Sequence, residues 1–423
     1  MNKIKSVKGM NDILPNESYI WLWLENKLTN WLSSYGYKNI RTPIIEDSSL
    51  FLRSIGEVTD IVEKELYIFT DRLNGDTLAL RPEGTAGCTR SIIEHNLLYN
   101  SIQKLWYIGQ MFRHERPQKG RYRQFHQLGV EVFGLMTHNI DVELILMVED
   151  LFKQLCLQEI ELQINCLGDI NERNIYKQNL VEYFERYKSC LDEDSLKRLY
   201  KNPLRILDSK NEKMMDLISN APKLINFLSD NSLSFYQRLK DTLSSLNIKF
   251  IENLYLVRGL DYYNLTVFEW VSTKLGAQST IAAGGRYDLL IEHLGGKKNY
   301  AVGFAIGIER LILELSAQEK LPEEKNSDIF IINFGEKTDI QAFNFAIKLR
   351  QVGFKVEQNF SDLSLKSLLK KADSLGYKFV IIIGETELST ETVVLKNMKT
   401  THQHIIKNSE LINFITNNYN EEK

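Results

Sequence analysis

The sequence predicts an α+β protein with an antiparallel sheet and flanking helices, a helical insertion, and a separate C-terminal α/β domain. Three observations lead to this prediction. Residues 105–111 and 125–133 carry two strand patterns joined by one loop, which is the arrangement of an antiparallel hairpin. Residues 171–250 have helical spacing and few strand signals. After residue 327, strand and helix patterns alternate, which is typical of a small α/β domain.

The composition is that of a globular cytosolic protein. A chain of 423 residues with 43% hydrophobic residues suits about two or three domains with full-sized cores. The net charge of −3 argues against a general nucleic-acid coating protein but leaves room for a local basic patch. The four cysteines lack Cys-x-x-Cys spacing, so we expect reduced core thiols, no structural zinc and a cytoplasmic location. No apolar run approaches the roughly 18 residues of a membrane-spanning helix, and we expect no membrane partner.

The first half of the chain is expected to begin with an aromatic helix over residues 17–34, followed by a strand over residues 37–46. Pro43 within that strand indicates an edge or an interface. The pair suits a subunit contact, although a plain core explains it equally well. Residues 66–70 and 77–80 read as a hairpin across Asn74-Gly75, a helix then runs through His95, and another spans residues 141–157.

In the second half, strand patterns return at residues 254–257, 266–271 and 281–287, and an apolar helix is expected over residues 302–315. Residues 322–326 are polar and read as a linker. Beyond it we expect strands at 329–333, 355–357, 379–383 and 392–396, with helices at 339–352 and 364–375. The predicted domains are a first part of the main domain (1–170), a helical insertion (171–250), a second part of the main domain (251–322) and a C-terminal domain (327–423).

The most informative stretch is the loop of the long hairpin. Between residues 113 and 123 it has five Lys or Arg against one Glu, a local charge of +4 that favours phosphate ligands. On the second strand, Phe125, Gln127, Gly129 and Glu131 share a face. We expect Gly129 to leave a gap in which a small polar ligand fits. A solvated basic turn is about as probable from this stretch alone, but the flanking aromatic residues favour a buried hairpin.

Other motifs are weaker when taken singly. Glu83 and Thr85 would share a face in an extended chain and suit an ammonium group, although a Pro-Glu-Gly turn is the commoner meaning. Arg258 precedes a glycine and two adjacent tyrosines, Tyr262 and Tyr263, of which one is expected to line a pocket; a surface arginine beside core aromatics is the alternative.

Two glycine motifs complete the set. Consecutive glycines within residues 283–287 would let the backbone approach a ligand, or mark a tight turn or bulge. Residues 303–310 have glycines one helical turn apart, which would let a helix press on the sheet. The phosphate-binding loop Gly-x-x-x-x-Gly-Lys-Ser/Thr and the dinucleotide fingerprint Gly-x-Gly-x-x-Gly are missing from the sequence. Any ATP must therefore be held by arginines on an antiparallel sheet.

Together these segments resemble class II aminoacyl-tRNA synthetases. Residues 112–125 are similar to motif 2, residues 303–310 to motif 3, and residues 37–43 with the preceding helix to motif 1. Residues 256–263 and 282–288 resemble two blocks particular to the histidyl-tRNA synthetase family, as do residues 8–12 and 80–87. The resemblance covers the whole chain, and departures at Gln110, Leu265, Ile281 and Ala282 remove no charged group.

The resemblance implies a class II synthetase fold with a C-terminal anticodon-binding domain. It implies the ATP-dependent ligation of L-histidine to tRNA(His) through a histidyl-adenylate, with release of AMP and diphosphate. The implied partners are L-histidine, ATP with Mg²⁺, tRNA(His) and a second copy of the chain in a homodimer, and no metal held by the protein alone. The alternative is a synthetase-like subunit that senses histidine without aminoacylation; such chains typically lack the C-terminal domain. A general nucleic-acid-binding protein is a third possibility, disfavoured by the near-neutral charge.

The resemblance also assigns roles to single residues. Arg113 and Arg258 are the implied catalytic residues, at the α-phosphate and beside the substrate carboxylate respectively. The implied ATP-binding residues are Arg113, Glu115, Phe125 (stacked on adenine) and Arg310 (on the γ-phosphate). The implied histidine-binding residues are Glu83, Thr85 and Gln127 for the ammonium group, Glu131 and Tyr263 for the imidazole, and Arg258 and Tyr262. Arg116 and Gln118 would meet the acceptor end of the tRNA.

Overall fold

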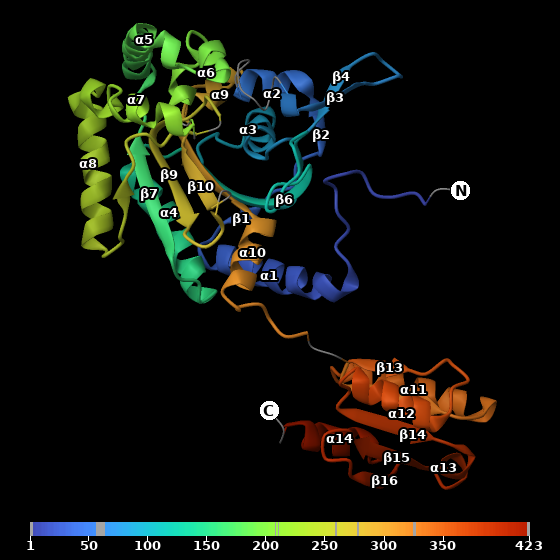
Figure 1. The fold of residues 1–423 in the computed structure, drawn as a ribbon. Helices are drawn as coiled ribbons and strands as arrows, with labels where there is room; N and C mark the ends of the chain where they lie inside the picture. The colour runs from blue at the N-terminus through green and yellow to red at the C-terminus, as the bar shows by residue number, and fades with distance from the viewer. Residues whose placement is uncertain are drawn as a thin grey trace. The chain divides into compact units, whose positions relative to one another are not determined.

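The computed structural model of this chain describes residues 3–55, 64–207, 209, 211–258, 260–276, 279–324 and 327–420. The chain forms two compact units, Met1–Pro322 and Glu323–Lys423 (Figure 1). The expected linker falls at this division, but its last two residues, 325 and 326, lie outside the described residues.

A large, mostly antiparallel sheet forms the centre of the first unit. In the described residues its strand order is β1-β5-β6-β11-β10-β9-β7-β8. The five pairings from β5 to β7 are antiparallel, and the two short edge strands, β1 and β8, pair in parallel. The strands are β1 (Lys38–Asn39), β5 (Gln103–Phe112), β6 (Gln124–Phe133), β7 (Ile160–Cys166), β8 (Ile251–Glu252), β9 (Asn264–Ser272), β10 (Thr280–Arg286) and β11 (Ala301–Gly307).

The predicted long hairpin is confirmed. Strands β5 and β6 pair along their full lengths, from Gln103 opposite Phe133 to Phe112 opposite Gln124. The basic loop therefore leaves one end of a rigid ribbon, beside the central strands of the sheet.

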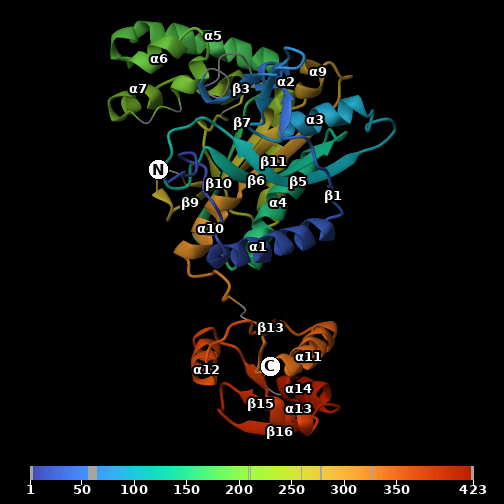
Figure 2. The ribbon, with the colours of Figure 1, turned by 90° about the vertical axis from the view of Figure 1, so that its right-hand side faces the viewer.

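Helices cover both faces of this sheet. Helices α1 (Pro15–Ser34), α4 (His138–Gln154) and α10 (Ile308–Ala317) lie on one side, and α2 (Ser48–Ile55) and α3 (Thr85–Glu94) lie on the other (Figures 1 and 2). Helix α1 buries Ile20, Leu24, Leu28, Trp31 and Leu32, which recur at helical spacing. A small antiparallel sheet in the order β2-β4-β3 and a short helix accompany α2; the elements are β2 (Ile45–Asp47), β3 (Tyr67–Thr70), β4 (Thr77–Leu80) and α9 (Leu290–His293).

The chain between β7 and β8 is helical. It contains α5 (Ile170–Arg186), α6 (Glu193–Arg198), α7 (Met215–Ser219) and α8 (Asp230–Ser245), with short 3-10 turns between them. Helix α5 begins at a capping box, in which Asp169 accepts from the backbone of Glu172 and Glu172 accepts from the backbone of Asp169. This helical segment shares one hydrophobic core with the large sheet, because Tyr176, Leu180 and Phe184 belong to the same buried cluster as the strands.

The second unit is a three-layer α/β fold. Its sheet, in the order β13-β12-β14-β15-β16, is parallel through β14 and antiparallel beyond it. Residues of α11 and α14 pack on one face and residues of α12 on the other. The elements are β12 (Ile329–Asn333), α11 (Asp339–Gln351), β13 (Val356–Gln358), α12 (Leu365–Ser374), β14 (Phe379–Ile383), α13 (Glu385–Ser389), β15 (Thr392–Asn397), β16 (Gln403–Lys407) and α14 (Leu411–Asn420).

Three predictions of secondary structure are wrong. Residues 302–307 form strand β11, and only α10, from Ile308, is helical. A short apolar run has no periodicity that separates a doubly buried strand from a helix, and pairing on both edges decided the outcome. Residues 254–257 form a turn and loop instead of a strand, and the expected strand over residues 37–46 is split into β1 and β2, with Pro43 between them.

At Trp31 the aromatic helix matches the alternative of a plain core, because this side chain is 2% exposed, while Trp21 and Trp23 are half-buried. The prediction that the cysteines are core thiols needs correction. Of the four cysteines, only Cys88 and Cys166 are buried core thiols; Cys156 and Cys190 are exposed.

No helix among the described residues is long and apolar enough to cross a membrane.

Candidate active site

A trough of small residues crosses the middle of the large sheet. The register places Tyr107 of β5, Gly129 of β6, Ala305 of β11 and Ala283 of β10 in one row across the sheet. A second row places Gly109, Gln127 and Gly307 side by side. Ala283, Ala305 and Gly307 line a cavity that lies directly on strands β10 and β11, because their side chains are small or absent, whereas the Tyr107 ring fills the space at Gly129. Gly307 lines the cavity, and Gly303 makes room for Glu131, whose Oε2 would lie 1.9 Å from a Cβ at position 303, so neither glycine has the helix-packing role that the sequence predicted.

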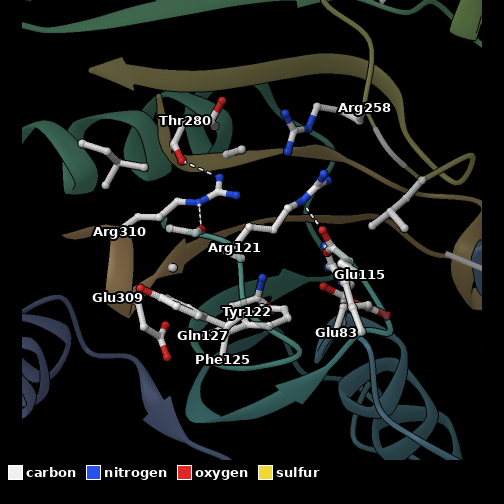
Figure 3. A pocket seen from close by; sticks show the side chains of 18 of the residues that line it. Glu83, Glu115, Arg121, Tyr122, Phe125, Gln127, Arg258, Thr280, Glu309 and Arg310 are labelled. Carbon is white, nitrogen blue, oxygen red and sulfur yellow. Dashed lines mark hydrogen bonds and ion pairs between the residues drawn. The ribbon is translucent and has the colours of Figure 1, made fainter. Parts of the chain in front are cut away.

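A cavity occupies this trough and brings together most of the predicted site residues (Figure 3). The turn before α3, the β5–β6 hairpin, the loop before β9, strand β10 and the start of α10 all contribute to it. Predicted residues that line it are Glu83, Thr85, Arg113, Glu115, Phe125, Gln127, Arg258, Tyr262, Tyr263 and Arg310. Residues that line the cavity without a predicted binding or catalytic role include Arg121, Tyr122, Leu260, Thr280 and Glu309.

Four arginines converge on the cavity, namely Arg113 and Arg121 from the β5–β6 loop, Arg258 from the loop before β9 and Arg310 from α10. Arg310 donates to the carbonyls of Gly120 at 3.0 Å and Thr280 at 2.9 Å, so the start of α10 is tied to the hairpin loop and to β10. Burial lowers the pKa of Arg310, and the nearby cations of Arg113, Arg121 and Arg258 lower it further. Arginines that repel one another in a partly buried cavity make a strong site for a polyanion.

The other three arginines are also oriented by the protein. Arg113 donates from Nε to the carbonyl of Pro82 at 2.9 Å, and its guanidinium lies 5.1 Å from the centre of the Phe125 ring. Arg258 pairs with Glu269 at 2.9 Å, and Arg121 pairs with the buried Glu115 (Figure 3). These contacts preorganise the cations before a ligand arrives.

Glu83 is positioned at the beginning of α3. Its carboxylate accepts from the backbone N–H groups of Thr85 at 2.7 Å and Ala86 at 2.9 Å. The extended chain in which Glu83 and Thr85 would share a face does not form, because Thr85 is already helical. Burial raises the pKa of Glu83, while these N–H groups, the Thr85 hydroxyl and the Arg113 cation oppose the rise.

Glu131, a predicted histidine-binding residue, does not itself line the cavity and is only 1% exposed. Its carboxylate accepts from the hydroxyls of Thr85 at 2.7 Å and Tyr107 at 3.0 Å, and from that of Tyr287. Burial raises the pKa of Glu131 to about 8, against the lowering effect of these three hydroxyls. Thr85 both lines the cavity and contacts Glu131, so it connects the two.

The gap at Gly129 is filled by a side chain. A Cβ atom at position 129 would lie 2.0 Å from Cζ of Tyr107, and one at position 84 would lie 2.2 Å from Cε2 of the same ring. The expectation that a ligand occupies this gap is therefore wrong. The absence of side chains at Gly84 and Gly129 instead leaves room for the Tyr107 ring, whose hydroxyl donates to Glu131. Tyr107 could have been found from the sequence only by pairing the two predicted strands, which places it opposite Gly129.

The remaining candidates divide into surface and interior positions. Arg116 and Gln118 are exposed in the hairpin loop and do not line the cavity. The consecutive glycines at positions 284 and 285 pack against backbone of the neighbouring strands, where a Cβ would lie 2.2 Å from the Gly303 carbonyl oxygen and 2.5 Å from that of Thr266. They serve strand packing, and the following Arg286 is fully buried in an ion pair with Asp141.

Comparisons with known proteins agree with this geometry. The family model described as histidyl-tRNA synthetase matches residues 9–311, and one described as an anticodon binding domain matches residues 328–418. The chain is 50% identical over 415 residues to a Histidine–tRNA ligase of Laribacter hongkongensis, covering 98% of each chain. It is 52% identical over 396 residues to one of Dechloromonas aromatica, covering 94% of this chain and 92% of that one.

A solved structure supports the same assignment. The apo histidyl-tRNA synthetase of S. aureus superposes with a TM-score of 0.82 at 36% identity, covering 97% of this chain and 99% of the other. The family model, the sequence relatives and the fold all point the same way, and the chain belongs to the histidyl-tRNA synthetase family.

Proposed function

We propose that this protein is a histidine–tRNA ligase, which joins L-histidine to tRNA(His) through a histidyl-adenylate and releases AMP and diphosphate. The observation that carries the proposal is the cavity in which four arginines adjoin a polar pocket of Glu83, Thr85 and Gln127. One end suits the phosphates of ATP, and the other suits an amino acid. Membership of the histidyl-tRNA synthetase family supports histidine as that amino acid.

In the first step, the histidine carboxylate attacks the α-phosphorus of ATP and diphosphate leaves. Two anions must approach each other, so cations have to offset their repulsion. Arg113 would bind the α-phosphate and Arg310 the γ-phosphate, while Arg258 would lie between the carboxylate and the α-phosphate. Arg113 is held by the Pro82 carbonyl and Arg258 by Glu269, which supports fixed positions for both charges.

Phe125 would stack on the adenine, and Glu115, beside Arg113 and Arg121, would complete the ATP site. Magnesium would accompany ATP and would supply positive charge that offsets the charge of the phosphates. The carboxylates of Glu115 and Glu309 line the same cavity and have the oxygen chemistry that Mg²⁺ prefers.

Glu83, Thr85 and Gln127 would hold the ammonium group, and Tyr262, Tyr263 and Glu131 would surround the imidazole. The carboxylate of Glu131 has its three hydroxyl donors in place, and a carboxylate can accept at about four lone-pair positions. A further N–H of an imidazole can therefore be accommodated. Such a contact fixes which ring nitrogen carries the proton and excludes isosteres that lack a donor.

In the second step, histidine passes to the terminal adenosine of the tRNA. Arg116 and Gln118, exposed in the loop beside the cavity, would contact the acceptor end. The second unit, which matches an anticodon-binding domain, would hold the anticodon. The work of a tRNA ligase would place the protein in the cytoplasm.

The protein is proposed to act as a homodimer. The small sheet beside α2 exposes apolar side chains that a second copy would cover, namely Ile45, Ile68 and Phe69, each at least 40% exposed. Leu22 on α1 is 61% exposed, and we propose that the second copy also covers this part of the first helix. The buried Trp31 takes no part in it.

Histidine-dependent exchange of radiolabelled diphosphate into ATP tests the first step. Exchange with histidine but with no other amino acid is expected, followed by charging of tRNA(His). A subunit that only senses histidine would bind it without exchange. The four arginines and the second unit favour the ligase over that alternative.

A further inference from the structure

The helical segment between β7 and β8 donates hydrogen bonds to the loop that carries Tyr262 and Tyr263, two of the predicted histidine-binding residues. Residues 260–263 form neither strand nor helix, and Leu260, Tyr262 and Tyr263 line the cavity. Irregular chain has no ladder of backbone hydrogen bonds to fix it, so its conformation depends on what packs against it.

Arg173, on the first turn of α5, supplies one set of these contacts. Its side chain is 6% exposed, and Nη1 donates to the carbonyl of Tyr263 and, at 3.3 Å, to that of Asp261. Burial lowers the pKa of Arg173, and the carboxylates of Asp261 and Asp169 oppose the change. A buried cation directed at two carbonyls of one loop is costly unless those acceptors stay in place.

Asn202, from the turn before the helical residues 203–206, supplies a second contact. It is 2% exposed, and Nδ2 donates to both carboxylate oxygens of Asp261, at 3.0 and 3.3 Å. The same loop is therefore held by two separate parts of the helical segment. Arg173 donates to its carbonyls, and Asn202 donates to the Asp261 side chain.

Through Tyr263, this loop contacts Tyr287, one of the residues around Glu131. The Tyr263 ring lies 6.3 Å from that of Tyr287 in an edge-on arrangement, and the Tyr287 hydroxyl donates to Glu131. A Cβ added at Gly285 would lie 3.0 Å from the Tyr263 ring, so that ring has little room to shift. Displacing the Tyr263 carbonyl would move its ring and disturb the cluster around Glu131.

We propose that Arg173 and Asn202 are positioning residues, through which the helical segment sets the geometry of residues 260–263 and thereby the affinity for histidine. This inference rests on the proposed function and adds to it a route by which whatever binds the helical segment can alter the amino-acid site. Arg173 and Asn202 act through Asp261 and Tyr263 and need not touch the substrate.

The test compares Arg173→Lys with Tyr176→Phe in the full-length protein. Lysine keeps the charge but lacks the fork that reaches two carbonyls. Tyr176 is the matched control, because it lies on the same helix and its buried side chain donates to the Pro222 carbonyl at 2.7 Å, within the helical segment and away from the loop. Histidine KM, ATP KM and kcat are measured by diphosphate exchange, and thermal midpoints are recorded.

We expect Arg173→Lys to raise the histidine KM about tenfold, with ATP KM nearly unchanged. Tyr176→Phe should lower the thermal midpoint without changing the histidine KM. An unchanged histidine KM in Arg173→Lys, or an equal rise in Tyr176→Phe, would overturn the proposal, because the effect would then be absent or a general loosening.

Asn202→Ala keeps the proposal testable if Arg173→Lys does not fold. It removes the donor to Asp261 and should also raise the histidine KM selectively; no change would count against the inference. Histidine binding is followed in parallel by calorimetry. Absence of exchange in the wild-type protein would refute the ligase function, whereas histidine binding that is weakened only in the Arg173 and Asn202 variants would still support the positioning role.

Discussion

Replacing Glu131 by glutamine tests the amino-acid side of the cavity most directly. The substitution preserves the shape of the side chain and removes its charge. In the wild-type protein, the Glu131 side chain accepts hydrogen bonds from the hydroxyls of Thr85, Tyr107 and Tyr287. Hydroxyls can rotate to donate to or accept from an amide, so we expect Glu131→Gln to fold with its surroundings intact.

The magnitude follows from the type of hydrogen bond that is lost. A bond to a charged group contributes about 1.5–3 kcal/mol, and a neutral one about 0.5–1.5 kcal/mol. At pH values above about 8, where Glu131 is ionised, exchanging one for the other at the imidazole N–H should cost roughly 1–2 kcal/mol, which corresponds to about a 5- to 30-fold rise in the histidine KM. The ATP KM should hardly change, because the phosphate-binding arginines are on other elements.

The pH dependence gives a second readout with a defined sign. Burial raises the pKa of Glu131 to about 8 from an ordinary 4.5, so the folded protein holds this proton more tightly than the unfolded chain does. The stability that this group contributes is complete below the ordinary pKa and is lost as the pH rises through about 8. The free energy of unfolding of the wild-type protein should therefore fall, relative to that of Glu131→Gln, across this range.

Histidine affinity should change in the opposite direction. Only the carboxylate form accepts the imidazole N–H as a charged partner, so the wild-type histidine KM should fall as the pH rises toward and past about 8. The histidine KM of Glu131→Gln should not show this fall with rising pH. Diphosphate exchange at a series of pH values, with histidine and ATP varied separately, measures both effects. A histidine KM that is the same in the two proteins at every pH would refute a role for Glu131 in the amino-acid site.

Three further predictions concern Arg258, the dimer and the second unit. Arg258→Ala should fold but lose roughly 100-fold or more in the rate of diphosphate exchange, because a preorganised cation is removed from the developing charge; near-normal exchange would exclude Arg258 from the chemistry. Sedimentation at micromolar concentration should give a dimer, and Ile68→Asp should shift it toward monomer, whereas a stable and active wild-type monomer would contradict the proposed interface. A chain ending at Pro322 should keep histidine-dependent exchange and lose most tRNA charging, since the cavity residues all precede that point and the second unit has its own core; full charging by a truncated protein that remains dimeric would disprove the anticodon role.

Local sequence pattern determined much of this protein. The alternation in residues 124–133 and the apolar run before it gave the β5–β6 hairpin, because strand periodicity and a single connecting loop leave few other arrangements. The basic loop and isolated arginines indicated a polyanion site before any contact was known. Arg113, Arg258 and Arg310 were found in this way and by resemblance, and all three line one cavity.

Tertiary structure decided the features that depend on pairing across the sheet. Residues 302–307 became a strand because both edges found partners, which no local period could indicate. Gly129 proved to make room for Tyr107 rather than for a ligand, since the side chain that fills a gap comes from the neighbouring strand. In the hydroxyl cluster, Tyr287 donates to Glu131 across 156 positions of sequence, and only the folded sheet brings the two residues together.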